Sequence, residues 1–141
     1  MTEELGENAK LPHRIQIDLR FGDTDMQGHI NNAVYATLYE SGRVNFLYGP
    51  HGDLMPKGRT FVIAELSIRF VDEILYPGAV DVFSGVHRIG NSSVGLVQEL
   101  RVNGQLKSHA TSVVVMIDNA KRKSAPLDEA TRARMAKLLI T

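Results

Sequence analysis

A carboxylate, a glycine and a histidine lie close together where a strand-like run gives way to a helix-like run: Asp25, Gly28 and His29. An alternating apolar pattern precedes them at 13–21, and helix-forming residues follow at 32–48. A helix N-terminus presents unpaired backbone N–H groups and a partial positive charge. A carboxylate or imidazole beside such donors could promote attack on a carbonyl group, because the donors would bind the developing oxyanion.

Each of these residues also has a purely structural interpretation. Asp25 could cap backbone N–H groups, Gly28 could hold a positive φ in a turn, and His29 could be a polar turn residue. Asp23 lies two residues earlier and competes with Asp25 for any catalytic role. Residue types and spacing alone leave these alternatives open.

Residues on the predicted helix extend the candidate site and include an alternative to Asp25 as the catalytic carboxylate. Asn32 could cap the helix and also reach the site, and Tyr35 lies on the same face, where it could pack or line a pocket. Glu40 is a rival carboxylate, and its spacing from Arg43 allows the two to pair. Glu65 is a further rival, since an acidic residue in an apolar strand requires a partner or water.

Composition limits the classes of protein that this chain can be. Its 141 residues suit one domain, with 43% hydrophobic and 23% charged residues. Sixteen basic residues offset sixteen acidic ones, so no global charge favours nucleic acid or an anionic membrane. No apolar run approaches the roughly 20 residues that span a bilayer. We expect a cytoplasmic protein with a loose tail at 1–12 and a single domain at 13–141.

Metal and thiol chemistry find no support in the sequence. The chain has no cysteine, which excludes disulfides, a thiol nucleophile and thiolate metal ligands. The five histidines have no metal-ligand spacing with carboxylates: His13, His29, His51, His87 and His109. We therefore predict neither a metal site nor a cofactor.

The remaining elements predict a mostly antiparallel sheet covered by the helix at 32–48. Asn31 or Asn32 is the expected N-cap of that helix, and Gly49-Pro50 is the expected stop. Short turns, including Asn103-Gly104, join the strands that follow. A single sheet must cover its apolar face, for which the long helix is the candidate. The expected elements are strands at 13–21, 61–70, 79–89, 94–102 and 105–117, and a terminal helix after Asp128 whose buried stripe is Leu127, Ala130, Met135, Leu138 and Leu139.

An α+β chain with a five-stranded antiparallel sheet around one long helix has the hotdog architecture. The segment Phe21–Tyr35, followed by Tyr39–Arg43, closely resembles the 4-hydroxybenzoyl-CoA thioesterase-like branch of hotdog acyl-CoA thioesterases. The resemblance extends from His13 to about Leu138, although the matches in its later part mostly indicate a shared fold. The front segment is the specific part.

The resemblance implies an activity and an assembly. Asp25 would be the catalytic carboxylate, acting as nucleophile or as general base in hydrolysis of an acyl-CoA or acyl-carrier thioester. Gly28, His29, Asn32 and Tyr35 would bind the substrate. Relatives form homodimers whose sheets join, often paired into tetramers, with sites at the dimer interface.

Two local groups of basic residues could meet the phosphates of coenzyme A. Arg88 follows His87, and we include Arg88 among the expected substrate-binding residues. The second group is the run Lys121–Lys123, for which a solvated loop is the simpler interpretation.

Two other functions remain open at this stage. One is a non-catalytic module that binds acyl thioesters, since fold does not determine function. The other is a hotdog hydratase or dehydratase, whose family pattern of Asp, His and an Asn-Pro loop differs from the spacing of Asp25 and His29 here.

Overall fold

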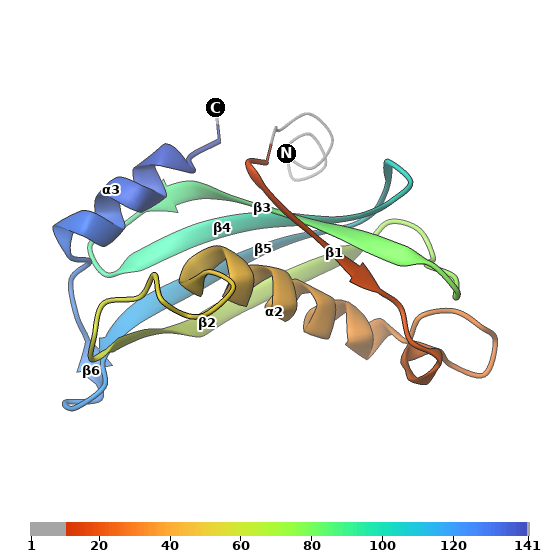
Figure 1. The fold of residues 1–141 in the computed structure, drawn as a ribbon, viewed down its shortest axis with the longest axis horizontal. Coiled ribbons are helices and arrows are strands. Elements are labelled where there is room, and N and C mark those ends of the chain that lie inside the picture. Colours follow the sequence, from red (N-terminus) through yellow and green to blue (C-terminus); the bar gives the residue numbers. More distant parts are fainter. Residues whose placement is uncertain (1–10, 141) are drawn as a thin grey trace.

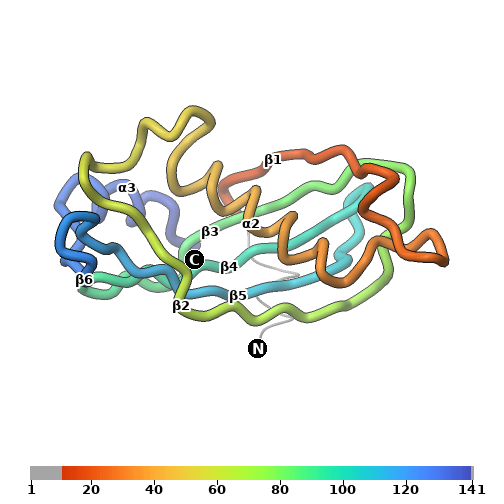
Figure 2. Tube along the Cα trace, turned by 90° about the horizontal axis from the view of Figure 1, so that it is seen from below, coloured from red at the N-terminus to blue at the C-terminus, as the bar shows by residue number. Residues whose placement is uncertain are grey.

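A long helix crosses one face of a curved antiparallel sheet in the computed structural model, which describes residues 11–140 (Figure 1). The strand order is β1-β3-β4-β5-β2, and a short sixth strand pairs with β5. Figure 2 shows the five long strands in this order, with the helix α2 lying across them. The strands are β1 (His13–Asp18), β2 (Arg59–Phe70), β3 (Ala79–Ile89), β4 (Ser93–Val102), β5 (Gln105–Asp118) and β6 (Lys123–Ser124). The hotdog fold expected from the sequence is confirmed.

The helix α2 (Asn32–Tyr48) has the predicted bounds because both of its ends carry strong local signals. The side chain of Asn31 accepts a hydrogen bond from the N–H of Ala33 at 2.9 Å, which makes Asn31 the N-cap. Gly49 ends the helix with a φ of 79°, a value that favours glycine. One apolar cluster packs under the first half of α2 and a second under its last turns, with buried members that include Tyr35, Leu38, Tyr39, Phe46 and Leu47.

Gly42 lies where α2 packs tightly against the sheet. A Cβ atom at this position would overlap the Cγ1 atom of Val82 on β3 and would lie 3.3 Å from Nε2 of Gln98 on β4. Because Val82 is β-branched and fully buried, it has little freedom to move aside. The glycine therefore sets the distance between helix and sheet.

We expect Gly42→Ala to destabilise the protein by about 1–3 kcal/mol from overpacking. This loss exceeds the gain of about 1 kcal/mol that alanine brings within a helix. Urea unfolding of the variant and of Ser41→Ala, an exposed neighbour on the same helix, measures the difference. A Gly42→Ala protein more stable than wild type would show that α2 can move away from the sheet without loss of stability.

Several element boundaries differ from the sequence-based prediction. The first strand ends at Asp18 rather than Phe21, because a short 3-10 helix, η1 (Phe21–Asp23), turns the chain before the loop. The strand β6 was not predicted. The helix α3 (Glu129–Lys137) buries Thr131 and Met135, whereas Ala130 and Leu139 are exposed and were wrongly placed in its buried stripe. Leu127 and Met135 are buried as predicted, and Asp128 caps α3 by accepting a hydrogen bond from the N–H of Thr131.

The strand β2 forms an edge of the sheet and carries an apolar surface along its length. It pairs with β5 on one side only. Five large apolar side chains at this edge are between 37% and 49% exposed: Val62, Ile63, Leu66, Phe70 and Val71. An exposed apolar edge strand is a template for pairing with another chain.

Two further features complete the description of the fold. Within residues 11–140, no helix combines the length and apolar character needed to cross a membrane. Of the predicted tail at 1–12, residues 1–10 lie outside the described part of the chain.

Candidate active site

The loop that carries Asp25 is held in place by backbone pairing at both of its ends. Asp25 donates its N–H to the carbonyl of His29 at 2.8 Å, and Ile30 donates to the carbonyl of Ile74 at 2.8 Å. His29 also forms an antiparallel bridge with Leu75. Gly28 adopts a φ of 82°, so its place in this turn favours glycine. The loop is thereby fixed against the segment that joins β2 to β3.

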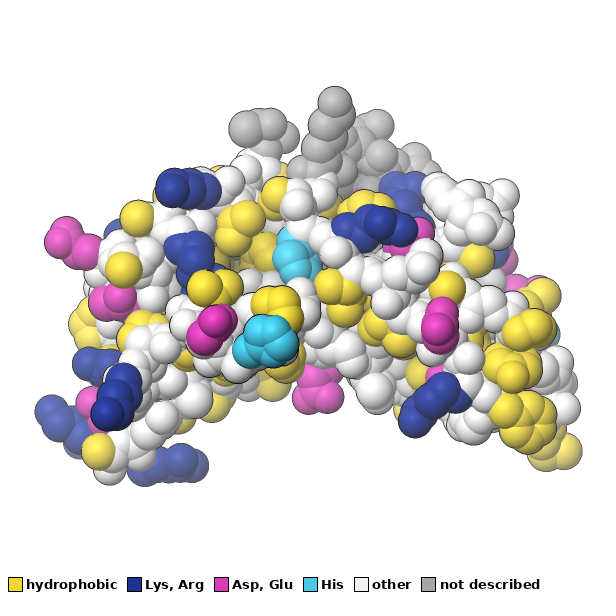
Figure 3. Space-filling model, viewed as in Figure 1, with side chains coloured by type: hydrophobic (Ala, Val, Ile, Leu, Met, Phe, Trp, Pro, Cys, Tyr) yellow, Lys and Arg dark blue, Asp and Glu magenta, His cyan; other side chains and the backbone are white. Residues whose placement is uncertain are grey.

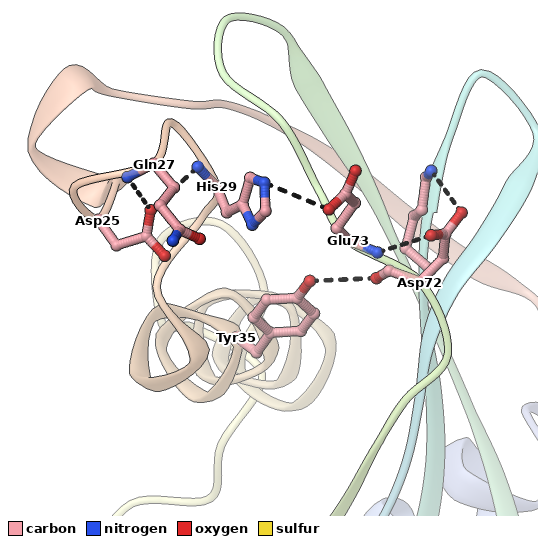
Figure 4. Close-up of polar contacts among 7 residues, drawn as sticks. Asp25, Gln27, His29, Tyr35, Asp72 and Glu73 are labelled. Carbon is pink, nitrogen blue, oxygen red and sulfur yellow. Dashed lines mark hydrogen bonds and ion pairs between the residues drawn. The ribbon is translucent and has the colours of Figure 1, made fainter.

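One oxygen of the Asp25 carboxylate is anchored and the other is not. Its Oδ1 atom accepts hydrogen bonds from the backbone N–H groups of Gln27 at 2.9 Å and His29 at 3.1 Å (Figure 4). The side chain lines a cavity of about 420 Å³, and Oδ2 has no hydrogen-bond partner among the described residues. Asp25 is exposed in the single chain. The arrangement fixes the carboxylate and leaves one oxygen available for chemistry.

Asp23, the nearby competitor, is committed to a structural role. Its two carboxylate oxygens accept hydrogen bonds from the backbone N–H and the guanidinium of Arg20, both at 2.9 Å. Its carbonyl accepts the N–H of Asn31 at 2.9 Å, which ties η1 to the helix start. The side chain of Asp23 is 7% exposed, so it is poorly placed to meet a substrate.

These contacts predict a pH-dependent contribution to stability. Hydrogen bonding to Arg20 holds the pKa of Asp23 below its ordinary value. The stabilisation is therefore present at neutral pH and is lost as pH falls through the lowered pKa. We expect Asp23→Asn to lower the free energy of unfolding by about 1–2 kcal/mol at pH 7, with a smaller difference at pH 3. Denaturant melts at the two pH values test this, and an equal loss at both would contradict it.

The cavity joins the loop, the start of α2 and the segment after β2. His29 points across it to Glu73, with 3.3 Å between Nε2 and Oε1, and the hydroxyl of Tyr35 donates to the carbonyl of Asp72 at 3.3 Å (Figure 4). The Tyr35 ring also packs edge-on against Phe70 at 4.8 Å. Burial raises the pKa of Tyr35, so this residue is a neutral donor at physiological pH. The cavity is lined by Asp25, His29, Ile30, Asn32, Tyr35, Phe70, Val71, Asp72 and Glu73.

Four of the predicted site residues therefore meet at one cavity: Asp25, His29, Asn32 and Tyr35. Gly28 shapes the loop but does not line the cavity. Arg88 lies near the other end of β3, about 30 Å along the strand from Ala79. The structure does not bring it to the cavity of its own chain.

The rival carboxylates lie elsewhere. Glu40 lines a separate, smaller cavity beside Arg43 on α2, and the two side chains form neither a hydrogen bond nor an ion pair. Glu65 is exposed on the edge strand β2. Neither residue lines the Asp25 cavity.

Sequence reasoning missed Asp72 and Glu73. Both lie shortly after the end of β2, beyond Val71, where they resemble ordinary turn residues. Lys107 binds the Asp72 carboxylate at 3.1 Å, and hydrogen bonding to Lys107 lowers the pKa of Asp72. Only the pairing of the 74–76 segment with the loop brings these acids to the site.

An apolar rim surrounds the end of the molecule that bears the loop. Figure 3 shows hydrophobic side chains gathered at the right-hand end, where the loop after β1 lies in Figure 1. Exposed residues of this region are Phe21, Met26, Leu75 and Tyr76. Within residues 11–140, no three histidine or acidic side chains are grouped so that they could hold a metal ion.

Comparisons with known proteins agree on one family. Residues 19–135 match the model of the thioesterase-like superfamily. A thioesterase from Thermus thermophilus, solved with coenzyme A and zinc, is 31% identical, with 91% of this chain and 94% of that chain covered and a TM-score of 0.78. A predicted thioesterase from Bacillus stearothermophilus is 29% identical, with 90% and 96% covered and a TM-score of 0.81.

A more distant structure shares the fold. The DHNA-CoA thioesterase from Staphylococcus aureus is 22% identical, with 88% of this chain and 91% of that chain covered and a TM-score of 0.75. No curated protein sequence matches the chain.

Proposed function

Because this chain belongs to the thioesterase-like superfamily and is a thioester hydrolase, we propose that it hydrolyses acyl-CoA thioesters with Asp25 as the catalytic carboxylate. The relative solved with coenzyme A supports this carrier. An acyl carrier protein is the alternative source of the same thioester.

The observation that carries the proposal is the asymmetry of the Asp25 carboxylate. Two backbone donors hold Oδ1, so the side chain has one orientation, and Oδ2 is left for the reaction. Oδ2 acts either as a nucleophile on the thioester carbonyl or as a base that takes a proton from the attacking water. In the base route the water oxygen bonds to the carbonyl carbon, the C–S bond breaks, and the thiolate takes up the proton as the free acid leaves. In the nucleophilic route Oδ2 bonds to that carbon and displaces the thiolate, and water then hydrolyses the resulting anhydride to release the acid and restore Asp25.

The start of α2 is the proposed oxyanion site. The backbone N–H of His29 already donates to Asp25, so it is not available to the substrate. Asn32, the first residue of the helix, lines the cavity, and a first-turn N–H has no intrahelical partner. The N–H of Asn32 and the helix dipole would bind the charge on the carbonyl oxygen.

A dimer joined along β2 completes the proposal. The exposed apolar edge of β2 offers backbone groups and apolar side chains to a second copy. Phe70 and Val71 belong both to this edge and to the cavity wall. A partner paired here would therefore cover the cavity and desolvate Asp25. Association of two such dimers into a tetramer is a further step of the same proposal.

The basic run Lys121–Lys123 is the proposed contact for coenzyme A phosphates. It lies at the Arg59 end of β2, since Arg59 pairs with Asp118 in the sheet and β6 follows directly. Figure 3 shows basic side chains gathered at the left-hand end, where β6 lies in Figure 1. In an antiparallel dimer this end of one chain lies beside the cavity of the other. Arg88 does not have this placement, so the basic run replaces it in the proposal.

The first test is thiol release from coenzyme A thioesters by the wild-type protein. A panel of short, long and aromatic acyl groups suits a thiol-reactive dye, because the chain has no cysteine. Release of coenzyme A from at least one member supports the proposal. Binding of acyl-CoA without release would instead identify a non-catalytic acyl-thioester module.

A further inference from the structure

The guanidinium of Arg43 is buried without a full set of hydrogen-bond partners. Arg43 lies in the second half of α2 and is 8% exposed, and its Nη1 atom is fully buried with no acceptor among the described residues. Burial lowers its pKa from the ordinary value, while the exposed carboxylate of Glu40 acts in the opposite direction. An arginine keeps its charge in proteins, so this group lacks the acceptor that a buried cation requires.

Arg43 faces a cavity of about 130 Å³ between α2 and β2. The other walls are mostly apolar and include Val44, Leu47, Phe61, Ile63 and Val114. Val44 and Ile63 are nearly half exposed, so the cavity reaches the surface at the free edge of β2. It has room for about four water-sized groups. The cavity could therefore accept the end of a short chain and place it against a cation.

The proposed dimer brings this cavity to the Asp25 site of the other protomer. Leu66 is the middle member of the exposed apolar series along β2. A two-fold axis there, with the register irregularity between Ile63 and Glu65, places Phe70, in the wall of the Asp25 cavity, opposite Val62 and Ile63 of the partner subunit. Val62 lies between Phe61 and Ile63, which line the Arg43 cavity. The two cavities then meet across the interface, on the side of the joined sheets where the α2 helices of both protomers lie.

The charges on the two sides are complementary. The Asp25 cavity is lined by the acidic residues Asp25, Asp72 and Glu73, of which Asp72 is paired with Lys107, and His29 is the only basic side chain among its described lining residues. A substrate carboxylate bound there would be repelled. Arg43 offers a guanidinium fork, which matches a carboxylate in shape and charge.

We infer that Arg43 of one protomer binds the far end of the acyl group whose thioester lies at Asp25 of the other protomer, and that this end is a carboxylate. The substrate class is thus a short dicarboxylic acyl thioester. This inference rests on the proposed function and on the proposed dimer. The apolar walls pack against the methylene groups between the two ends.

Two coenzyme A thioesters of equal chain length test the inference: hexanoyl-CoA, which ends in a methyl group, and adipoyl-CoA, which ends in a carboxylate. We expect wild type to prefer adipoyl-CoA by about tenfold or more in kcat/KM. Arg43→Met should lower kcat/KM for adipoyl-CoA at least about tenfold, mainly through KM, and change hexanoyl-CoA little. Arg43→Lys should retain part of the preference, and Arg14→Met controls for loss of an exposed arginine.

Other results overturn the inference without touching the proposed function. These are hydrolysis of both thioesters with no preference, or an equal loss for both in Arg43→Met. A Met variant that loses dimer stability but keeps its selectivity would show that the partner chain supplies the acceptor. If neither thioester is hydrolysed although another acyl-CoA of the panel is, the inference fails; if no acyl-CoA is hydrolysed, the proposed function fails instead. Binding of adipoyl-CoA to Asp25→Asn, with and without Arg43→Met, then tests Arg43 by calorimetry, and equal affinities would refute its role.

Discussion

Asp25→Asn should lower kcat by about 10³-fold or more. An amide oxygen can still accept the hydrogen bonds from the N–H groups of Gln27 and His29, so the loop should keep its shape. The amide cannot act as a base and is a poor nucleophile, so neither proposed route of hydrolysis can proceed through residue 25. The measurement is steady-state thiol release from the preferred substrate of the panel.

The matched control is Asp18→Asn. It removes the same charge from an exposed position at the end of β1, outside the Asp25 cavity. We expect this variant to retain wild-type kcat, and both variants to unfold at the same denaturant concentration as wild type. Full activity in Asp25→Asn would remove Asp25 from the mechanism.

The second large effect should come from the edge strand. We expect the double variant Ile63→Lys, Leu66→Lys to be a monomer at micromolar concentration with activity reduced at least about 100-fold. Lysines on an edge strand oppose pairing with another chain, and across a two-fold axis they face like charges. Without a partner, the Asp25 cavity stays open to water. Because water has a high dielectric constant, it weakens the electrostatic contacts within the cavity.

Sedimentation velocity measures the assembly, and thiol release measures the activity of the same samples. Leu139→Lys is the control, because Leu139 is 41% exposed but lies just after α3, away from β2. A fully active monomer would contradict the interface site. A double variant that stays dimeric would place the interface on another surface.

Elements with strong local signals were predicted at their observed bounds. The bounds of α2 followed from an asparagine cap and a Gly-Pro stop, and the strand at 79–89 was predicted to the residue. The hairpin at Asn103-Gly104 has positive φ at both residues, as its sequence indicates. The buried stripe of α3 was predicted in part: Leu127 and Met135 are buried, whereas Ala130 and Leu139 are exposed and Thr131 is buried instead.

The candidate site likewise has one part that the sequence predicts and one part that it does not. Asp25, His29, Asn32 and Tyr35 come from one continuous segment, so a sequence motif was enough to bring them together. Asp72 and Glu73 come from a segment much later in the chain, and no local pattern marks them. The role of Arg88 stays a prediction: its charge is visible in the sequence, whereas its place about 30 Å along β3 from Ala79 is known only from the structure.

The catalytic role of Asp25 stays a prediction until chemistry and binding are separated. The most direct test is single-turnover thiol release by wild type and Asp25→Asn, with enzyme in excess over the preferred acyl-CoA and with affinity measured separately. The proposal predicts rapid release by wild type, and unimpaired binding with release slowed by about 10³-fold in the variant. Equal single-turnover rates in the two proteins would contradict it.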